Sequence, residues 1–401
     1  MVIKIFQKGK IYKKYGDENM KKLSLMIVAL FAITCVFAEH QDYDSSCPTK
    51  CEPPPPPVCC DQPAAPTMSA YSHPARINVC GSWDFYVTGT FLWWQVMQEQ
   101  MEYAYQLFGT LTSTENATSP YIGQFYDFKF DWKPAFKVGL GYNFGYDDWS
   151  SFLQYTRVNT SMTNTATVGT LTAELLKDLW SLRVTPNTPT IREVKAKWGL
   201  DFNILDLEFS RPFYSGKELT FAPHFGLKGG WIDQSLICTS TDTLAVPVLA
   251  VNSDYASNSW LIGPRAGLYT NWMIGEGFRF FGNAAVSMFY QKFDDIKVTE
   301  PNAADAAQHI GSFTLNSHGV NTALEFLIGL GWGTYFDHNN WYFDLAVGYE
   351  TQVYFEQNMM RYLEELRKTQ TGGGYLNNLG IVTKPGNLMF QGLNVTMRFD
   401  F

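Results

Sequence analysis

The C-terminal end of the chain alternates between apolar and polar residues. From Leu393 to Phe401 the odd positions carry Leu, Val, Met and Phe, whereas the even positions carry Asn, Thr, Arg and Asp. A period of two residues predicts a β-strand whose two faces have different surroundings. Taken alone, this strand fits either a transmembrane barrel or a soluble β-sandwich.

The same alternation recurs along most of the chain. In these segments the face opposite the apolar one is rich in Gly and charged residues, which suits a water-filled interior better than a dry core. In the segment from Trp198, we predict that Trp198, Leu200, Phe202 and Ile204 face outward and that a bulge near Leu205 then shifts the phase. With the terminal strand there are ten predicted strands, and the other nine lie near residues 84–107, 126–144, 149–160, 198–210, 219–231, 260–272, 278–290, 324–332 and 341–349.

The connections between these strands alternate in length. Short ones fall near 146–148, 211–217, 274–277 and 337–340, and long ones near 108–124, 161–195, 232–257, 292–321 and 356–386. This alternation, with an even strand count, predicts an all-β transmembrane antiparallel barrel with short periplasmic turns, long external loops and both termini in the periplasm. The long loops leave room for twelve or more strands.

Two loop segments have the apolar spacing of short amphipathic helices, Leu171–Leu182 and Asn358–Lys368. Each would constrict the lumen, cap a loop or contact a neighbouring subunit, and the sequence leaves these alternatives open.

Tryptophans supply a second line of support for a membrane barrel. The predicted topology puts Trp149, Trp272 and Trp341 at periplasmic strand ends and Trp198, Trp231 and Trp260 at external ends. Aromatic residues gather in this way at the two interfaces of a membrane.

The N-terminal region predicts export. Lys21 and Lys22 precede an apolar run from Leu23 to Phe37, and Ala38 ends a small-residue cleavage site. We therefore interpret residues 1–38 as an over-extended start followed by a signal peptide that begins at Met20. Residues 39–82 would form a periplasmic linker and residues 83–401 the barrel in the bacterial outer membrane.

Composition agrees with this interpretation. Charged residues make up 17% of the chain and aromatic residues 16%, which fits a lipid-facing band flanked by aromatic girdles. Residues 1–38 hold seven basic and two acidic residues, so the mature chain would carry 23 basic and 36 acidic residues. This acidic balance argues against nucleic acid as a partner.

Cysteines cluster in the predicted linker. Cys47, Cys51, Cys59 and Cys60 flank the run Pro53–Pro57, and Cys80 lies just before the first strand. Export to an oxidising compartment predicts disulfides for these five residues, and no His stands at a zinc-like spacing. The disulfides would be either local or between this chain and other copies or envelope proteins.

The inward positions hold the candidate pore residues. Rings of charged and hydrogen-bonding side chains select the solutes that pass a water-filled pore. The alternative is that these charges pair across strands and only satisfy one another. The candidates are Glu102, Asp127, Lys129, Asp131, Lys133, Lys137, Lys228, Arg265, Glu325, Asp344, Glu350 and Arg398, and Arg279 could add to them.

Nothing in the sequence predicts an enzyme. There are six His, no G-x-S-x-G surrounds a Ser, and no catalytic triad order is evident. Phosphate-loop and metal-binding motifs are also missing from the sequence. We therefore expect neither a catalytic site nor a cofactor or metal.

Two segments resemble the Legionella-type major outer-membrane proteins, which also occur in chlamydia-like bacteria. The first is FYVTGTFLWW at 85–94 with MEYA at 101–104, and the second is FDWKPAFKVGLGY at 130–142 with DDW at 147–149. The resemblance is specific over about residues 83–160, and it implies a pore-forming envelope protein. The Cys- and Pro-rich segment departs from that family's pattern and is similar to cysteine cross-linked chlamydial envelopes.

The sequence thus predicts an outer-membrane porin that lets small hydrophilic solutes or ions diffuse passively. Its expected partners are outer-membrane lipid, these solutes and, through disulfides, itself or other Cys-rich envelope proteins. The alternative is a structural or adhesive surface barrel with an occluded lumen.

Overall fold

The structure is a computed structural model of the chain. It describes residues 71–81, 83–108, 122–145, 147–169, 174–182, 191–242, 249–301, 309–370 and 384–401. The predicted signal peptide and the cysteines at 47–60 lie outside the described residues.

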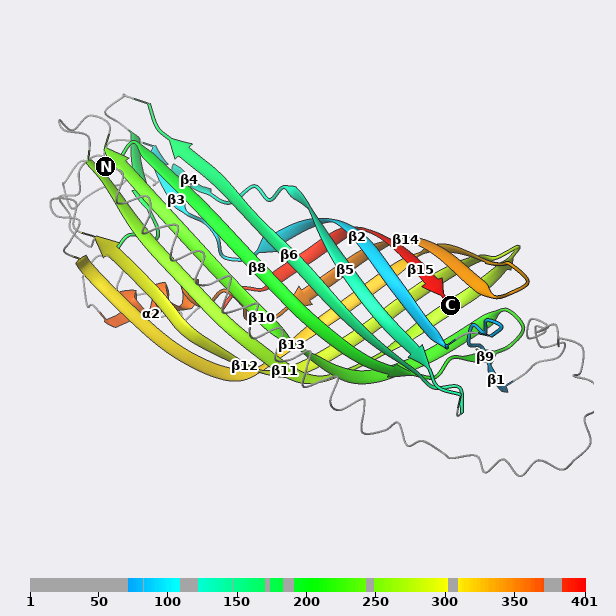
Figure 1. The fold of residues 1–401 in the computed structure, drawn as a ribbon. Helices are drawn as coiled ribbons and strands as arrows, with labels where there is room; N and C mark the ends of the chain where they lie inside the picture. Colours follow the sequence, from blue (N-terminus) through cyan, green and yellow to red (C-terminus); the bar gives the residue numbers. More distant parts are fainter. Residues whose placement is uncertain are drawn as a thin grey trace, which may run out of the picture. The chain divides into compact units, whose positions relative to one another are not determined.

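Ten antiparallel strands close into a barrel (Figure 1). Each strand pairs with its neighbours in chain order, β15 pairs with β2, and β8 pairs with both β6 and β10. The predicted fold class and strand number are therefore confirmed. The barrel strands are β2 (Phe85–Gln98), β5 (Trp132–Asn143), β6 (Ser150–Thr167), β8 (Glu193–Ser210), β10 (Leu219–Asp242), β11 (Leu249–Gly275), β12 (Phe278–Pro301), β13 (His309–Phe336), β14 (Trp341–Tyr354) and β15 (Leu388–Asp400).

The outer wall near the short turns is apolar. On β13, for example, Leu324, Phe326, Ile328 and Leu330 are exposed at alternate positions. Such a band is what lipid contact requires. No helix among the described residues is long and apolar enough to cross a membrane.

The polarity of the wall inverts halfway along the barrel, and β8 shows this most clearly. Its even positions all point inward, but those up to Ile204 are apolar, whereas Asp206 and Glu208 are charged. Lys195 and Lys197 are exposed on the outside of the apolar stretch. We call the part of the barrel near the short turns the polar half and the other part the apolar half, after their interiors.

This inversion corrects the sequence interpretation of β8. Trp198, Leu200, Phe202 and Ile204 are buried inside the barrel rather than facing lipid, and the pairing of β8 with β6 and β10 has no register shift at Leu205. Trp198 therefore does not belong to an external aromatic girdle. The outer wall of the apolar half is polar, which places it beyond the hydrocarbon layer, because a charged side chain facing lipid costs about 2–4 kcal/mol at the midplane.

Two of the predicted long loops, near 232–257 and 292–321, are largely strand, because the barrel wall continues beyond the membrane. β10 continues to Asp242 and β11 begins at Leu249, whereas β12 continues to Pro301 and β13 begins at His309. A strand needs about 9–11 residues to cross a membrane, but β13 has 28. The extra length carries alternation of the opposite sense, polar outside and apolar inside, which the sequence interpretation took for loop.

A lid closes the apolar end of the barrel. We use this name for the small sheet of β3 (Ala104–Phe108), β4 (Ile122–Tyr126) and β7 (Glu174–Asp178), together with helix α2 (Met359–Gln370). The helix predicted near 358–368 is confirmed. The helix predicted at 171–182 is wrong, because residues 174–178 pair with β3 as a strand.

The other end has the short turns and the C-terminus (Figure 1). Barrels of this kind keep their short turns in the periplasm, so the polar half opens there. Residues 71–81, which we call the mouth segment, cross this opening. Strand β1 (Tyr71–Pro74) pairs with β9 (Phe213–Ser215). The guanidinium of Arg76 donates a hydrogen bond to the backbone carbonyl of Phe144 at 2.7 Å. The backbone amide of Cys80 donates to the backbone carbonyl of Asn339 at 2.9 Å.

Candidate functional site

The polar half encloses a cavity of about 700 Å³. It extends from the middle of the barrel to the mouth segment, whose residues 73–77 form part of its wall. Ten strands give a lumen between that of small filled barrels and that of wide porins. The size and the polar lining make this cavity the candidate functional site.

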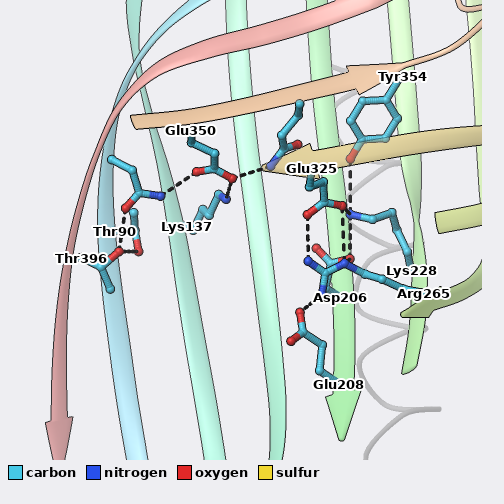
Figure 2. Close-up of polar contacts among 12 residues, drawn as sticks. Thr90, Lys137, Asp206, Glu208, Lys228, Arg265, Glu325, Glu350, Tyr354 and Thr396 are labelled. Carbon is cyan, nitrogen blue, oxygen red and sulfur yellow. Dashed lines mark hydrogen bonds and ion pairs between the residues drawn. The ribbon is translucent and has the colours of Figure 1, made fainter. Parts of the chain in front are cut away.

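A buried cluster of charges forms its floor (Figure 2). The ammonium of Lys228 lies 2.8 Å from carboxylate oxygens of both Asp206 and Glu325. The guanidinium of Arg265 donates to Glu325 at 2.8 Å and also pairs with Glu208. These five side chains come from β8, β10, β11 and β13. The cluster therefore links Glu325 on β13 to charges on the three consecutive strands β8, β10 and β11.

A second polar group lies on β2, β5, β14 and β15 (Figure 2). The ammonium of Lys137 lies 2.6 Å from Glu350, which also accepts a hydrogen bond from the amide of Asn394 at 2.6 Å. Thr90 and Thr396 share a hydrogen bond of 2.8 Å beside them. The carboxylate of Glu350 is thus fully partnered although it is buried.

Nearer the mouth the charged pairs are more open. Arg279 reaches across β13 to Asp344, with 2.8 Å between Nη2 and Oδ1. Gly331 makes this possible, because a Cβ there would lie 2.8 Å from the guanidinium carbon of Arg279. Arg398 donates to Asp400 at 2.6 Å and stacks 3.7 Å from the ring centre of Tyr86.

Aromatic side chains separate the polar half from the apolar half. The ring of Phe202 packs against Tyr354 and Phe390, with ring centres 5.2 and 4.6 Å apart, and all three side chains are fully buried. The hydroxyl of Tyr354 accepts a hydrogen bond from Lys228 at 3.3 Å, so it joins the charged floor to the apolar core.

Buried amides attach the lid above this aromatic layer. Gln357 exchanges hydrogen bonds with Gln291 of β12 at 2.8 and 2.9 Å. Asn358 accepts from the backbone amide of Arg361 at 3.1 Å, which caps α2, and donates to the carbonyl of Glu99 at 2.8 Å. The lid is therefore fixed by a few side-chain amides as well as by apolar packing.

Most of the predicted pore residues do point into the barrel. Lys133 lies half-buried in the apolar half, away from the cavity. Seven meet in the ion pairs described above. Six of them are buried, namely Lys137, Lys228, Arg265, Glu325, Asp344 and Glu350, and the seventh, Arg398, has a side chain that is 24% exposed.

Four predicted pore residues lie outside the barrel strands. Asp127, Lys129 and Asp131 are exposed in the coil between β4 and β5, because the run that the sequence predicts as one strand splits between the lid and the barrel. Phe128 is buried between them. Glu102 lies in the coil before β3, where its carbonyl accepts from the indole of Trp180 at 2.9 Å.

Sequence reasoning missed two members of the charged floor, Asp206 and Glu208. Both continue the even phase of β8 without interruption, so the signal was present. The phase shift predicted at Leu205 also turns Asp206 and Glu208 inward, so the alternation of the chain was sufficient to add both to the candidate pore residues.

Two cysteines lie among the described residues. Cys238, predicted in a loop, is a free thiol buried inside β10. Cys80 in the mouth segment is disulfide-bonded, and its partner lies outside the described residues. The pairing pattern of the five candidate cysteines stays a prediction.

The closed barrel, its apolar outer band and the polar cavity inside that band define the class of this protein as an outer-membrane β-barrel. The model of the family described as Legionella pneumophila major outer membrane protein precursor matches residues 78–401. The chain therefore belongs to this family, which confirms the resemblance and the bacterial outer membrane as its location.

Comparison with solved structures gives matches of low sequence identity and low TM-score. The outer membrane protease OmpT from Escherichia coli is 10% identical, with 79% of this chain and 96% of that chain covered and a TM-score of 0.39. The P. putida toluene transporter TodX is 7% identical, with 79% and 90% covered and a TM-score of 0.17. The comparison with curated proteins finds no match.

Proposed function

We propose that this barrel is a non-enzymatic porin that admits small hydrophilic solutes by passive diffusion. The observation that carries the proposal is the cavity of about 700 Å³ in the polar half, lined by charged and hydrogen-bonding side chains. A wall of this kind supports solvated solutes, whereas a barrel built only for stability would pack its interior closely and leave no cavity of this size.

Passage requires the lid to move. The apolar half is filled by buried side chains such as Trp94, Trp198 and Phe202, so the described arrangement corresponds to a closed pore. These three side chains belong to the wall strands β2 and β8, so opening would need them to rearrange in addition to displacement of the lid, whose strands β3, β4 and β7 are not part of the barrel wall.

The second candidate is a structural or adhesive surface barrel with an occluded lumen. The dry core of the apolar half favours it, because that core needs no opening to be stable. The polar outer wall and the lid would then serve as the surface that faces the environment.

Single-channel recording in planar bilayers separates the two candidates. The porin proposal expects discrete conductance steps from purified wild-type protein and longer open times when the lid is loosened by Asn358→Ala. If neither protein gives steps at any voltage or salt concentration, the porin proposal is refuted and the occluded barrel remains.

We also propose that the Cys-rich linker fastens the barrel to the envelope through disulfides. Its partners would be other copies of this chain or other Cys-rich envelope proteins. The mouth segment supports this, because it is hydrogen-bonded to the barrel turns and would anchor the linker there. Cys80 is itself disulfide-bonded within the chain, so the thiols that would form the cross-links are among those of Cys47, Cys51, Cys59 and Cys60. Non-reducing gels should show high-mass species that collapse on reduction. A variant without the five candidate cysteines that still forms those species would refute the tether.

A further inference from the structure

The charges around the cavity are balanced in number. Among the described residues that line it, five carry a cationic Arg or Lys side chain and five carry a carboxylate. A pore attracts ions of one sign when its wall carries an excess of the other sign. This wall has no such excess.

The charges are also balanced locally. Arg279 of β12 pairs with Asp344 of β14, and Asp344 stands directly opposite Arg398 of β15, which pairs with Asp400. Asp344 and Arg398 lie on neighbouring strands, which are about 5 Å apart, whereas Arg279 reaches Asp344 across β13 and Asp400 follows Arg398 on the same strand. Positive and negative groups therefore alternate along this part of the wall. The side chains of Arg279 and Arg398 are 16% and 24% exposed, so both guanidiniums reach the cavity.

Tyrosines add groups that can both donate and accept hydrogen bonds. The hydroxyl of Tyr269 donates to Glu208 at 3.0 Å, and that of Tyr342 lies 3.4 Å from Asp344. Both line the cavity with Tyr86. Their rings offer apolar faces beside polar edges, which suits solutes that carry hydroxyls on a carbon frame.

We propose that the cavity selects electrically neutral, strongly dipolar solutes, such as polyols and zwitterions, over ions of either sign. This inference rests on the proposed porin function and names the solutes that it passes. A neutral dipolar solute can bridge a guanidinium and the neighbouring carboxylate at once. A monovalent ion loses part of its hydration and meets attraction and repulsion of similar size.

Tracer flux into proteoliposomes tests the inference with three solutes of similar size, namely glucose, the glucosamine cation and the gluconate anion. For the wild type we expect glucose to enter fastest and the two ions to enter at similar, slower rates. The reversal potential in a KCl gradient should likewise give a potassium-to-chloride permeability ratio near one.

Two variants of one ion pair should shift this balance in opposite directions. Arg279→Gln leaves Asp344 uncompensated and should favour glucosamine and potassium, whereas Asp344→Asn should favour gluconate and chloride. One unit charge at 4 Å in water changes an ion's local concentration about fivefold, which sets the scale of each shift. The double variant should return to the wild-type ratio. Lys195→Gln, which removes a charge from the outer wall of β8, is the matched control and should leave the ratio unchanged.

The outcomes separate this inference from the function on which it rests. If the wild type passes glucosamine or gluconate much faster than glucose, the balanced-wall inference is wrong while the porin function stands. Shifts of the same sign in the two Arg279–Asp344 variants would also overturn it. If no solute enters through either the wild type or the Asn358→Ala protein, both proposals fail.

Discussion

The ammonium of Lys137 lies 2.6 Å from a carboxylate oxygen of Glu350, across the interior of the barrel from β5 to β14. Both side chains are less than 10% exposed. Two strands, β15 and β2, separate their backbones in the wall, so the pair ties together parts of the barrel that share no backbone hydrogen bonds.

Breaking this pair should destabilise the barrel. We expect Lys137→Met to lower the free energy of unfolding by about 3 kcal/mol, because it leaves the buried Glu350 carboxylate without its cation. Glu350→Gln should have a cost of similar size. The double variant should cost about 1–3 kcal/mol less than the two single changes added together. Urea unfolding in lipid vesicles, followed by tryptophan fluorescence, gives these values, and strict additivity would show that the two groups do not interact.

The dry core of the apolar half should be sensitive to cavities. Phe202→Ala should lower the free energy of unfolding by about 3–5 kcal/mol, because the ring is fully buried between Tyr354 and Phe390 and its removal leaves a void. The matched control is Phe326→Ala, whose ring is 52% exposed on the lipid-facing wall. Lipid can fill that space, so we expect a clearly smaller loss in the same unfolding assay. Equal losses would contradict the assignment of inside and outside.

The capping residue of α2 should control the lid. Asn358→Ala removes both the cap to Arg361 and the hydrogen bond to Glu99. The loss of the cap should destabilise the first turn of α2 by about 1 kcal/mol. Asn358→Asp keeps an acceptor for the cap and loses the donor. Hydrogen exchange should therefore accelerate in the first turn of α2 for the Ala variant and much less for the Asp variant. Equal protection in wild type and Ala variant would show that the cap does not hold the lid.

The lid should become less stable as pH rises through the weakly acidic range. Burial raises the pKa of Asp178 on β7 from 3.8 to about 6, so the folded lid binds more protons than the unfolded chain between these values. The free energy of unfolding thus falls as pH increases from about 4 to about 6, by at most about 3 kcal/mol, and this loss persists above pH 6.

Asp178→Asn separates this effect from other titrations. The amide can still accept from the backbone of Trp180 and can donate to Ser240, so we expect hydrogen exchange in residues 174–182 to be slower than in wild type at pH 7.5 and similar at pH 4, after correction for intrinsic rates. A variant that is less protected at pH 7.5 would mean that the ionised carboxylate stabilises the lid.

The pattern of the amino-acid sequence was sufficient to assign the class of fold and to place most of the inward charges. Alternation from Leu393 to Phe401 and in nine further segments was enough for a ten-stranded barrel, because lipid on one side and water on the other impose a period of two. The same phase placed Lys137, Arg265 and Glu350 inside correctly.

The sequence did not show which half of the barrel encloses the polar cavity and which half encloses the dry core; the arrangement of the strands in space was needed for that. Ile204 and Asp206 point into the same interior two residues apart, yet Ile204 belongs to the dry core and Asp206 to the buried cluster of charges, where it pairs with Lys228. Alternation alone cannot distinguish apolar-outside from apolar-inside, because both have the same period, and the difference depends on how far each strand continues beyond the membrane. The partners of each charge were likewise beyond the sequence, because Lys137 and Glu350 are 213 residues apart and only closure of the barrel brings them together.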